Sequence, residues 1–176
     1  MTGDLLIRPF QERDAKLVRD LFTLVNRQLA PPDGRDAFEA YIDRSIAEEI
    51  GRMSDYYREH HGDFWVAVRD SKVIGMFGLE RSGPKRMELR RMYVDPEARR
   101  GGIARRMLHF AEMECQRMGG ETLELSTSEL QPAALEHYRR AGYRLLREEV
   151  ADEASNKTVG GGIRRYYFEK AVGSTG

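Results

Sequence analysis

The first third of the chain combines one short strand pattern with two long stretches of helical spacing. Residues 5–10 have the length and apolar content of a strand. Residues 12–29 carry apolar side chains three and four positions apart, which predicts an amphipathic helix. The segment Ala30–Gly34 contains two adjacent prolines and ends this helix. A second helical stretch follows over residues 36–60, and we expect it to break at Gly51.

Strand patterns dominate the rest of the chain, and two helices are inserted between them. Residues 64–68 and 73–79 predict a hairpin with a polar turn, and residues 88–94 predict a third strand. Gly101-Gly102 then opens a helix that Gly119-Gly120 ends. The remaining predicted elements are a strand, a helix and two strands, over residues 122–126, 132–141, 143–148 and 163–172. This order of elements predicts a mixed α/β fold.

Length and composition indicate one globular domain. The chain has 176 residues, of which 40% are hydrophobic, and this is enough to bury a core. No linker, internal repeat or low-complexity tract divides it. We therefore expect a single domain over residues 4–172 and a short disordered tail over residues 173–176.

Charge and hydropathy argue against several classes of protein. The 29 basic and 29 acidic residues balance, which disfavours a dedicated nucleic-acid-binding protein, so no nucleic-acid partner is expected. No apolar run approaches the ~18 residues that a membrane span needs, so no membrane partner is expected either. The first residues lack the basic and apolar regions of a signal peptide, and we expect a cytoplasmic protein.

The few cysteine and histidine residues limit the metal and thiol chemistry open to the chain. Cys115 is the only cysteine, so neither an intramolecular disulfide nor a cysteine zinc site can form, and its apolar helical neighbours predict a core position. None of the four histidines has the spacing of a metal-binding pair with a carboxylate, and we expect no metal. His60-His61 stands next to a glycine and is expected to end a helix.

The segment from Glu88 to Ala104 carries the clearest functional signal, because it reads as a strand, a loop and a helix that begins at two glycines. Unpaired N–H groups at a helix N-terminus attract anions, and glycine lets a phosphate approach the backbone. Four cations surround this helix start, namely Arg99, Arg100, Arg105 and Arg106. The pattern favours a site for a pyrophosphate or similar group over an ordinary turn with solvated arginines. The chain has neither a phosphate-loop motif nor a dinucleotide-binding fingerprint.

Two motifs resemble those of the GNAT N-acetyltransferase superfamily. The run Arg99-x-x-Gly102-x-Ala104 after a strand resembles motif A, [QR]-x-x-G-x-[GA]. Residues 133–143, with two alanines, a tyrosine and a glycine-aromatic pair, resemble motif B. The resemblance covers residues 4–172. It implies a central mixed, mostly antiparallel sheet of about seven strands, flanked by helices and splayed between the fourth and fifth strands.

The chain departs from the family pattern near both motifs. Arg100 stands where many members have glycine, and Gly101 can compensate for it. Gln131 stands where many members have asparagine near the pantetheine, and its longer amide side chain can make a similar hydrogen bond. A histidine, His137, precedes the motif B tyrosine where an apolar residue is common.

The resemblance implies transfer of an acetyl group from acetyl-CoA to an amine by direct attack in a ternary complex. The loop of motif A would cradle the pyrophosphate, and the end of the preceding strand would pair its backbone with the pantetheine. A backbone N–H near Met92 would polarise the thioester carbonyl, as an oxyanion donor does. The implied acetyl-CoA-binding residues are Met92, Tyr93, Val94, Arg99, Arg100, Gly101, Gly102, Ile103, Ala104, Arg105 and Gln131.

Two residues have catalytic roles in the family. Tyr138 corresponds to the tyrosine that protonates the leaving thiolate, although on spacing alone it shares a helical face with Leu135 and Ala141 and reads as a core residue. Glu88 lies near the glutamate that in several members removes the amine proton, usually through water. The alternative is that Glu88 is one charge in a mixed run.

The acceptor has no motif of its own. We expect a small amine or an amino acid as the acceptor, with two alternatives: a non-catalytic acyl-CoA-binding sensor, or a protein or peptide acetyltransferase. Tyr56, Tyr57 and Trp65 either line the acceptor pocket or pack in the core. Dimers are frequent among such domains, so a homodimer stays open.

Overall fold

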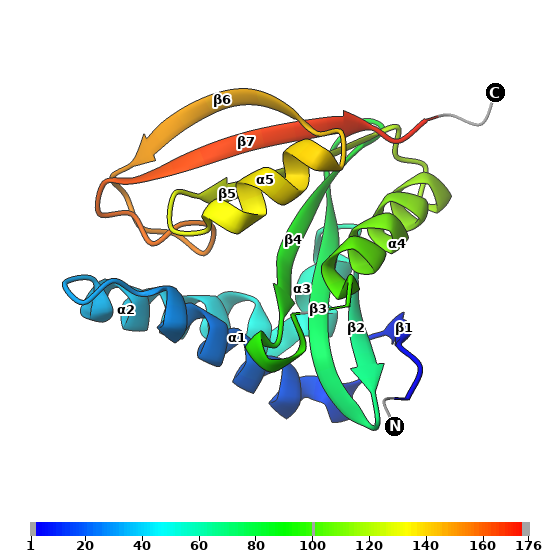
Figure 1. The fold of residues 1–176 in the computed structure, drawn as a ribbon, viewed down its shortest axis with the longest axis horizontal. Helices are drawn as coiled ribbons and strands as arrows, with labels where there is room; N and C mark the ends of the chain where they lie inside the picture. Colours follow the sequence, from blue (N-terminus) through cyan, green and yellow to red (C-terminus); the bar gives the residue numbers. More distant parts are fainter. Residues whose placement is uncertain (1–2, 100, 174–176) are drawn as a thin grey trace.

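The chain folds as one seven-stranded sheet with helices on both faces (Figure 1). The computed structural model describes residues 3–99 and 101–173. The strands follow the order β1-β2-β3-β4-β5-β7-β6. All neighbours are antiparallel except β4 and β5, which are parallel. The predicted class, a mixed and mostly antiparallel sheet of seven strands, is confirmed.

The predicted elements are all present, with shifted ends. The strands are β1 (Leu6–Pro9), β2 (Asp63–Arg69), β3 (Lys72–Gly83), β4 (Arg86–Val94), β5 (Thr122–Ser128), β6 (Arg144–Ala151) and β7 (Ile163–Ala171). The helices are α1 (Ala15–Leu29), α2 (Arg35–Glu48), α3 (Met53–Glu59), α4 (Ile103–Arg117) and α5 (Pro132–Arg140). A short 3-10 turn that includes Gly51 separates α2 from α3, so the predicted break is confirmed. Most of the tail expected to be disordered, residues 174–176, lies outside the described residues.

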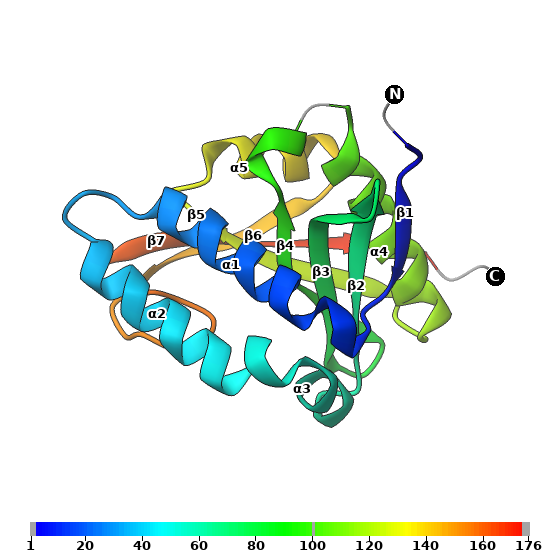
Figure 2. The same ribbon diagram turned by 90° about the horizontal axis from the view of Figure 1, so that it is seen from below.

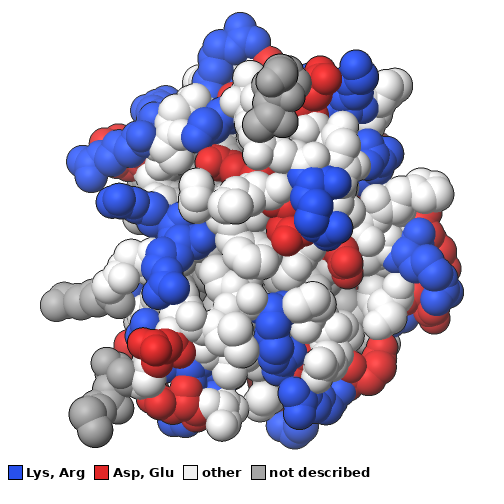
Figure 3. Space-filling model, turned by 90° about the vertical axis from the view of Figure 1, so that its right-hand side faces the viewer, with Lys and Arg blue, Asp and Glu red and all other residues white. Residues whose placement is uncertain are grey.

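Each face of the sheet has its own apolar core. Helices α1, α2 and α3 cover one face, and Figure 2 shows α1 and α2 crossing in front of the strands. Helices α4 and α5 cover the other face, where Trp65 stacks on Phe77 with 5.3 Å between ring centroids. Cys115 is buried in this second core, as predicted. On the face shown in Figure 3, basic and acidic side chains are interspersed, which agrees with the balanced composition.

Strands β4 and β5 separate soon after they begin. They pair only over residues 86–88 of β4 and 122–124 of β5, whereas β4 runs on to Val94 and β5 to Ser128. The predicted splay between the fourth and fifth strands is thus confirmed. A strand edge that loses its neighbour keeps unpaired N–H and C=O groups, so the gap is lined by backbone that can bind a ligand.

A one-residue bulge sets the direction of the β4 side chains inside this gap. Between the pairs Gly78–Arg90 and Met76–Tyr93, strand β4 holds one residue more than β3. Arg91, within the bulge, has a φ of 55°, in the left-handed region. A bulge interrupts the alternation of a strand. The consecutive side chains of Arg90 and Arg91 consequently lie on the same face, toward Tyr56 and Phe22 of the α1–α3 layer.

These two arginines meet a buried carboxylate at the end of α2. Glu49 has no exposed surface and accepts hydrogen bonds from both guanidinium groups, with 2.9 Å from Arg91 Nε to its Oε2. The Tyr57 hydroxyl donates to the same carboxylate at 3.0 Å. Burial by itself would raise the pKa of Glu49, but the charges of Arg91 and Arg90 outweigh it and hold the pKa below its ordinary value. The ion cluster of Glu49, Arg90 and Arg91 therefore fastens β4 to the helical layer.

We expect Glu49→Gln to lower the free energy of unfolding by ~3–5 kcal/mol, because it removes the carboxylate that pairs with buried Arg91 and one of the two that pair with buried Arg90. Urea unfolding measures this change. Glu39→Gln is the matched control, since the ion pair between Glu39 and Arg27 is exposed, and it should leave the urea midpoint almost unchanged.

The effect has a defined pH dependence. A carboxyl whose folded-state pKa is depressed stabilises the fold above its unfolded-state value of about 4.3, and this contribution disappears as the pH falls through the folded-state pKa. The difference between wild type and Glu49→Gln should therefore shrink in acid. A midpoint for Glu49→Gln that equals that of Glu39→Gln at neutral pH would show that the buried cluster does not hold the fold.

Candidate active site

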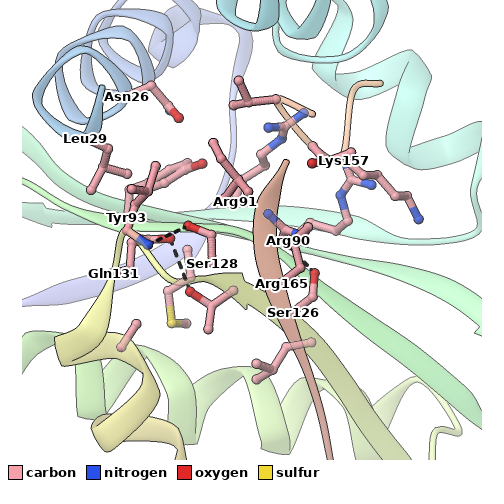
Figure 4. A pocket seen from close by; sticks show the side chains of 18 of the residues that line it. Asn26, Leu29, Arg90, Arg91, Tyr93, Ser126, Ser128, Gln131, Lys157 and Arg165 are labelled. Carbon is pink, nitrogen blue, oxygen red and sulfur yellow. Dashed lines mark hydrogen bonds between the residues drawn. The ribbon is translucent and has the colours of Figure 1, made fainter. Parts of the chain in front are cut away.

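A pocket opens where β4 and β5 separate (Figure 4). Its walls come from both strands, the start of α5, parts of α1 and α2, the loop between β6 and β7, and the start of β7. The polar residues that line it include Asn26, Glu88, Arg90, Arg91, Tyr93, Ser126, Gln131, Tyr138, Lys157 and Arg165. The pocket therefore brings together residues that are far apart in the chain, and most of their side chains are polar or charged.

The start of α4 is open in the way that anion binding requires. Gly101 and Gly102 have φ values of 103° and 74°, and a Cβ added at either one would meet no atom within 4 Å. The first backbone hydrogen bond of the helix joins Arg106 N–H to the Gly102 carbonyl. The three N–H groups of residues 103–105 thus have no partner within the helix. A pyrophosphate fits such a cradle, because free donors and the helix dipole both favour negative charge.

The residues predicted to bind the pyrophosphate differ in their exposure at the start of α4. Ile103 is buried in the core, so its backbone alone reaches the cradle. Arg99 and Arg105 are exposed beside it. Arg100, also predicted, lies outside the described residues.

The β4 edge supplies backbone groups to the gap. The Asp95 N–H donates to the Ile74 carbonyl of β3 at 2.8 Å. Because the N–H groups of successive strand residues point to opposite neighbours, the N–H of Val94 faces away from β3, toward the gap. The side chains of Met92 and Val94 pack into the core beneath α4 and α5. At the gap, Val94 therefore presents a backbone N–H that β3 does not use.

Tyr138 belongs to both the core and the pocket. Its ring lies 5.8 Å from that of Tyr143 and 6.2 Å from that of Phe168, and 8% of the residue is exposed. Among residues 3–99 and 101–173 nothing is hydrogen-bonded to its hydroxyl. Burial raises the pKa of Tyr138 well above the ordinary phenol value, and the nearby Tyr93 raises it further. The hydroxyl thus keeps its proton at neutral and mildly alkaline pH.

Glu88 lies on the pocket wall in contact with a lysine of the β6–β7 loop. The Lys157 ammonium donates to Glu88 Oε2 at 2.9 Å and to Glu80 Oε1 at 3.0 Å. Burial lowers the pKa of Lys157, but Glu88 and Glu80 outweigh this effect and raise it, so the side chain stays charged. The second oxygen of Glu88 has no hydrogen bond from the part of the chain that the structure describes.

Gln131 lies at the entrance to α5 and also lines the pocket. Its Oε1 accepts a hydrogen bond from the Thr127 hydroxyl at 3.2 Å. This contact orients the amide, whose nitrogen can donate to a ligand.

The aromatic residues considered for the acceptor pocket lie elsewhere. Trp65 is in the core beneath α4. The Tyr56 hydroxyl donates to Glu80 at 2.7 Å, and the Tyr57 hydroxyl donates to Glu49. All three are buried and none lines this pocket, which fits the packing alternative. Their rings pack in the apolar cores, and the two tyrosine hydroxyls are hydrogen-bonded to the buried carboxylates of Glu80 and Glu49.

Sequence reasoning missed the cationic side of the pocket. Arg90 and Arg91 read as charges of a mixed run, and strict alternation would place them on opposite faces. A double arginine inside an otherwise apolar strand was the only available signal. Lys157 and Arg165 come from a loop and a late strand, and no motif marks them.

No group of three His, Cys, Asp or Glu side chains in the described ranges is arranged to hold a metal ion. Of the helices that the structure describes, none combines the length and hydropathy of a membrane span.

Solved structures share this fold over nearly the whole chain. The PaiA N-acetyltransferase from Thermoplasma acidophilum, in complex with coenzyme A, superposes with a TM-score of 0.73 at 18% identity, covering 96% of this chain and 99% of that one. An aminoglycoside 6'-N-acetyltransferase complexed with coenzyme A superposes with a TM-score of 0.72 at 18% identity, covering 97% and 99%. The likeness defines the fold as that of these acetyltransferases.

Residues 19–143 match the acetyltransferase (GNAT) family, and the chain belongs to that family. Human N-acetyltransferase 8 is 30% identical over 110 residues, which cover 59% of this chain and 48% of the relative. The N-acetylaspartate synthetase of Danio rerio is 31% identical over 120 residues, which cover 65% and 41%. The chain thus matches less than half the length of these curated relatives.

Proposed function

We propose that the protein is an acetyl-CoA-dependent N-acetyltransferase that transfers the acetyl group to the amine of a small molecule or an amino acid, by direct attack in a ternary complex. The observation that carries this proposal is the gap between β4 and β5, whose walls hold an unpaired strand edge and the residues Tyr138 and Glu88. Family membership and the coenzyme A complexes of the structural relatives support it.

In this proposal, acetyl-CoA is a substrate that supplies the activated acetyl group. The N–H groups of residues 103–105 bind the pyrophosphate, with Arg99 and Arg105 beside them, and Arg100 is assigned from the motif alone. The backbone of residues 92–94 pairs with the pantetheine amides, and an N–H near Met92 stabilises charge on the thioester oxygen. Gln131 donates its amide to the pantetheine.

Two side chains move protons in the proposed reaction. Tyr138 donates its hydroxyl proton to the leaving sulfur, and its raised pKa keeps that proton in place until the thiolate forms. Glu88 accepts the amine proton, directly or through water, with the oxygen that Lys157 does not use. A base matters because a lysine-like amine with a pKa of ~10.4 is less than ~0.1% neutral at pH 7, whereas an α-amino group is about a tenth neutral.

The surroundings of the pocket favour a small acceptor. Residues of α1, α2 and the β6–β7 loop line the pocket together with β4, β5 and α5, and a pocket bounded by so many elements suits a small acceptor better than a protein. The relative named N-acetylaspartate synthetase forms an acetylated amino acid, which supports an amino-acid acceptor. A protein acetyltransferase and a non-catalytic sensor are the alternatives, and a cytoplasmic location and a homodimer stay predictions.

Acetyl-CoA should stabilise the fold. At about 100 times the dissociation constant, a ligand that binds only the native state adds ~2.7 kcal/mol. For a chain of this size each kcal/mol shifts the melting temperature by ~2–4 °C, so a thermal-shift assay should show an increase of roughly 5–11 °C. NAD and ATP, which lack pantetheine, are the controls. No shift with excess acetyl-CoA or CoA would end the substrate assignment.

Gly102→Asp should weaken acetyl-CoA binding at least tenfold, about 1.4 kcal/mol, because it places a Cβ and a negative charge in the cradle. Gly119→Asp is the matched control. Gly119 also has a positive φ and open space around its Cβ, but it lies at the other end of α4. Calorimetry measures both. If the two variants bind acetyl-CoA equally well, the pyrophosphate lies elsewhere.

Tyr138→Phe should lower turnover ~10²-fold or more while acetyl-CoA binding changes little, because it removes the proposed acid and keeps the ring packing. Tyr143→Phe is the control, since the Tyr143 hydroxyl contacts Glu112 at 3.1 Å and not the pocket. It should change stability more than turnover. The raised pKa of Tyr138 means that wild-type activity should not fall through loss of this proton below pH ~10. If Tyr138→Phe keeps near wild-type turnover, Tyr138 is a packing residue and not the acid.

A further inference from the structure

The charges around the pocket balance except at one residue. Three cations are matched by three carboxylates: Arg90 contacts Glu49 and Glu80, Arg91 contacts Glu49, and Lys157 contacts Glu80 and Glu88. Arg165 of β7 is the fourth cation of the lining. In the part of the chain that the structure describes, its guanidinium forms no ion pair. The pocket thus carries one net positive charge.

Arg165 is held in place without being neutralised. Its Nη2 donates to the Ser126 hydroxyl of β5 at 2.8 Å, and Figure 4 shows the two side chains meeting at the pocket wall. The residue is half-buried. Glu149 pairs with Arg165 across β6 and β7, but its carboxylate accepts from Arg147 Nε at 2.7 Å. A neutral hydroxyl therefore positions a guanidinium that keeps free donors for a ligand.

We propose that Arg165 binds a carboxylate of the acceptor, so that the enzyme selects amino acids over amines that lack a carboxylate. This inference rests on the proposed function and names its substrate class. The planar guanidinium presents paired N–H donors that match the two oxygens of a carboxylate, and one carboxylate neutralises the one unmatched charge. In a partly desolvated pocket an unpaired cation is costly, and an acceptor that pairs with it is favoured.

The test compares the twenty common L-amino acids with their α-carboxamides as acceptors. The best amino acid should have a kcat/KM at least tenfold above that of its carboxamide, although the carboxamide amine is the more readily deprotonated of the two. Arg165→Gln should abolish this preference, chiefly through KM, and Arg165→Lys should restore part of it. Arg144→Gln, at the exposed start of the neighbouring strand β6 and paired with Glu169, should keep the wild-type preference.

Binding measurements separate this inference from the proposed function. Calorimetry of each amino acid with the CoA complex, and with the free protein, should show weaker binding to Arg165→Gln than to wild type. If wild type acetylates carboxamides as well as amino acids, the role of Arg165 is overturned and the acetyltransferase assignment stands. If acetyl-CoA does not bind but amino acids do so through Arg165, the proposed function fails and the carboxylate site stands. If no amino acid binds or reacts, the inference is overturned.

Discussion

A full negative charge inside a protein is tolerable only beside positive charge. In this fold the fully buried carboxylate of Glu49 requires such a partner. Its carboxylate lies between two guanidinium groups of β4 and under the Tyr57 hydroxyl of α3. Arg91 extends the cluster further, because it also donates to the Asn156 carbonyl at 2.6 Å. The end of α2, the α3 helix, strand β4 and the β6–β7 loop are thus fixed against one another by one set of charges. All of them border the pocket or support its walls.

The bulge in β4 makes that arrangement possible. A left-handed backbone conformation at a non-glycine residue costs roughly 1–2 kcal/mol, and Arg91 adopts it with a φ of 55°. The ion pairs and the hydrogen bond to Tyr41 that the turned side chain gains offset this cost. The same bulge lies beside the place where β4 loses β5 as a neighbour. Bulges commonly re-aim side chains next to active sites, and here the bulge directs Arg91 into the ion cluster.

The local features of the fold could be predicted from the sequence, and the long-range ones could not. Helical and strand periodicity located the helices and strands, and the glycines at 101 and 102 marked the start of α4. These signals are carried by residues within a few positions of one another. The face that Arg91 takes depends on a register shift between two strands, and the polar partners of Tyr56 and Tyr57 come from other elements. The spacing of residues along the chain does not predict contacts between distant elements. Arg165 was missed for the same reason, since only the fold brings it to Ser126.

Tyr138 shows why packing and chemistry need not be alternatives in such a pocket. The rings of Tyr143 and Phe168 pack against the phenol in the core, and the same residue lines the pocket. The burial that fixes the ring also raises the pKa of the hydroxyl, so the group stays a donor where a solvated phenol would begin to ionise. The other wall holds the ion pair of Lys157 with Glu88, and the carboxylates of Glu88 and Glu80 raise the pKa of Lys157 despite its burial. The pocket thus combines an apolar wall, which surrounds Tyr138, with a charged wall, which contains Glu88 and Lys157.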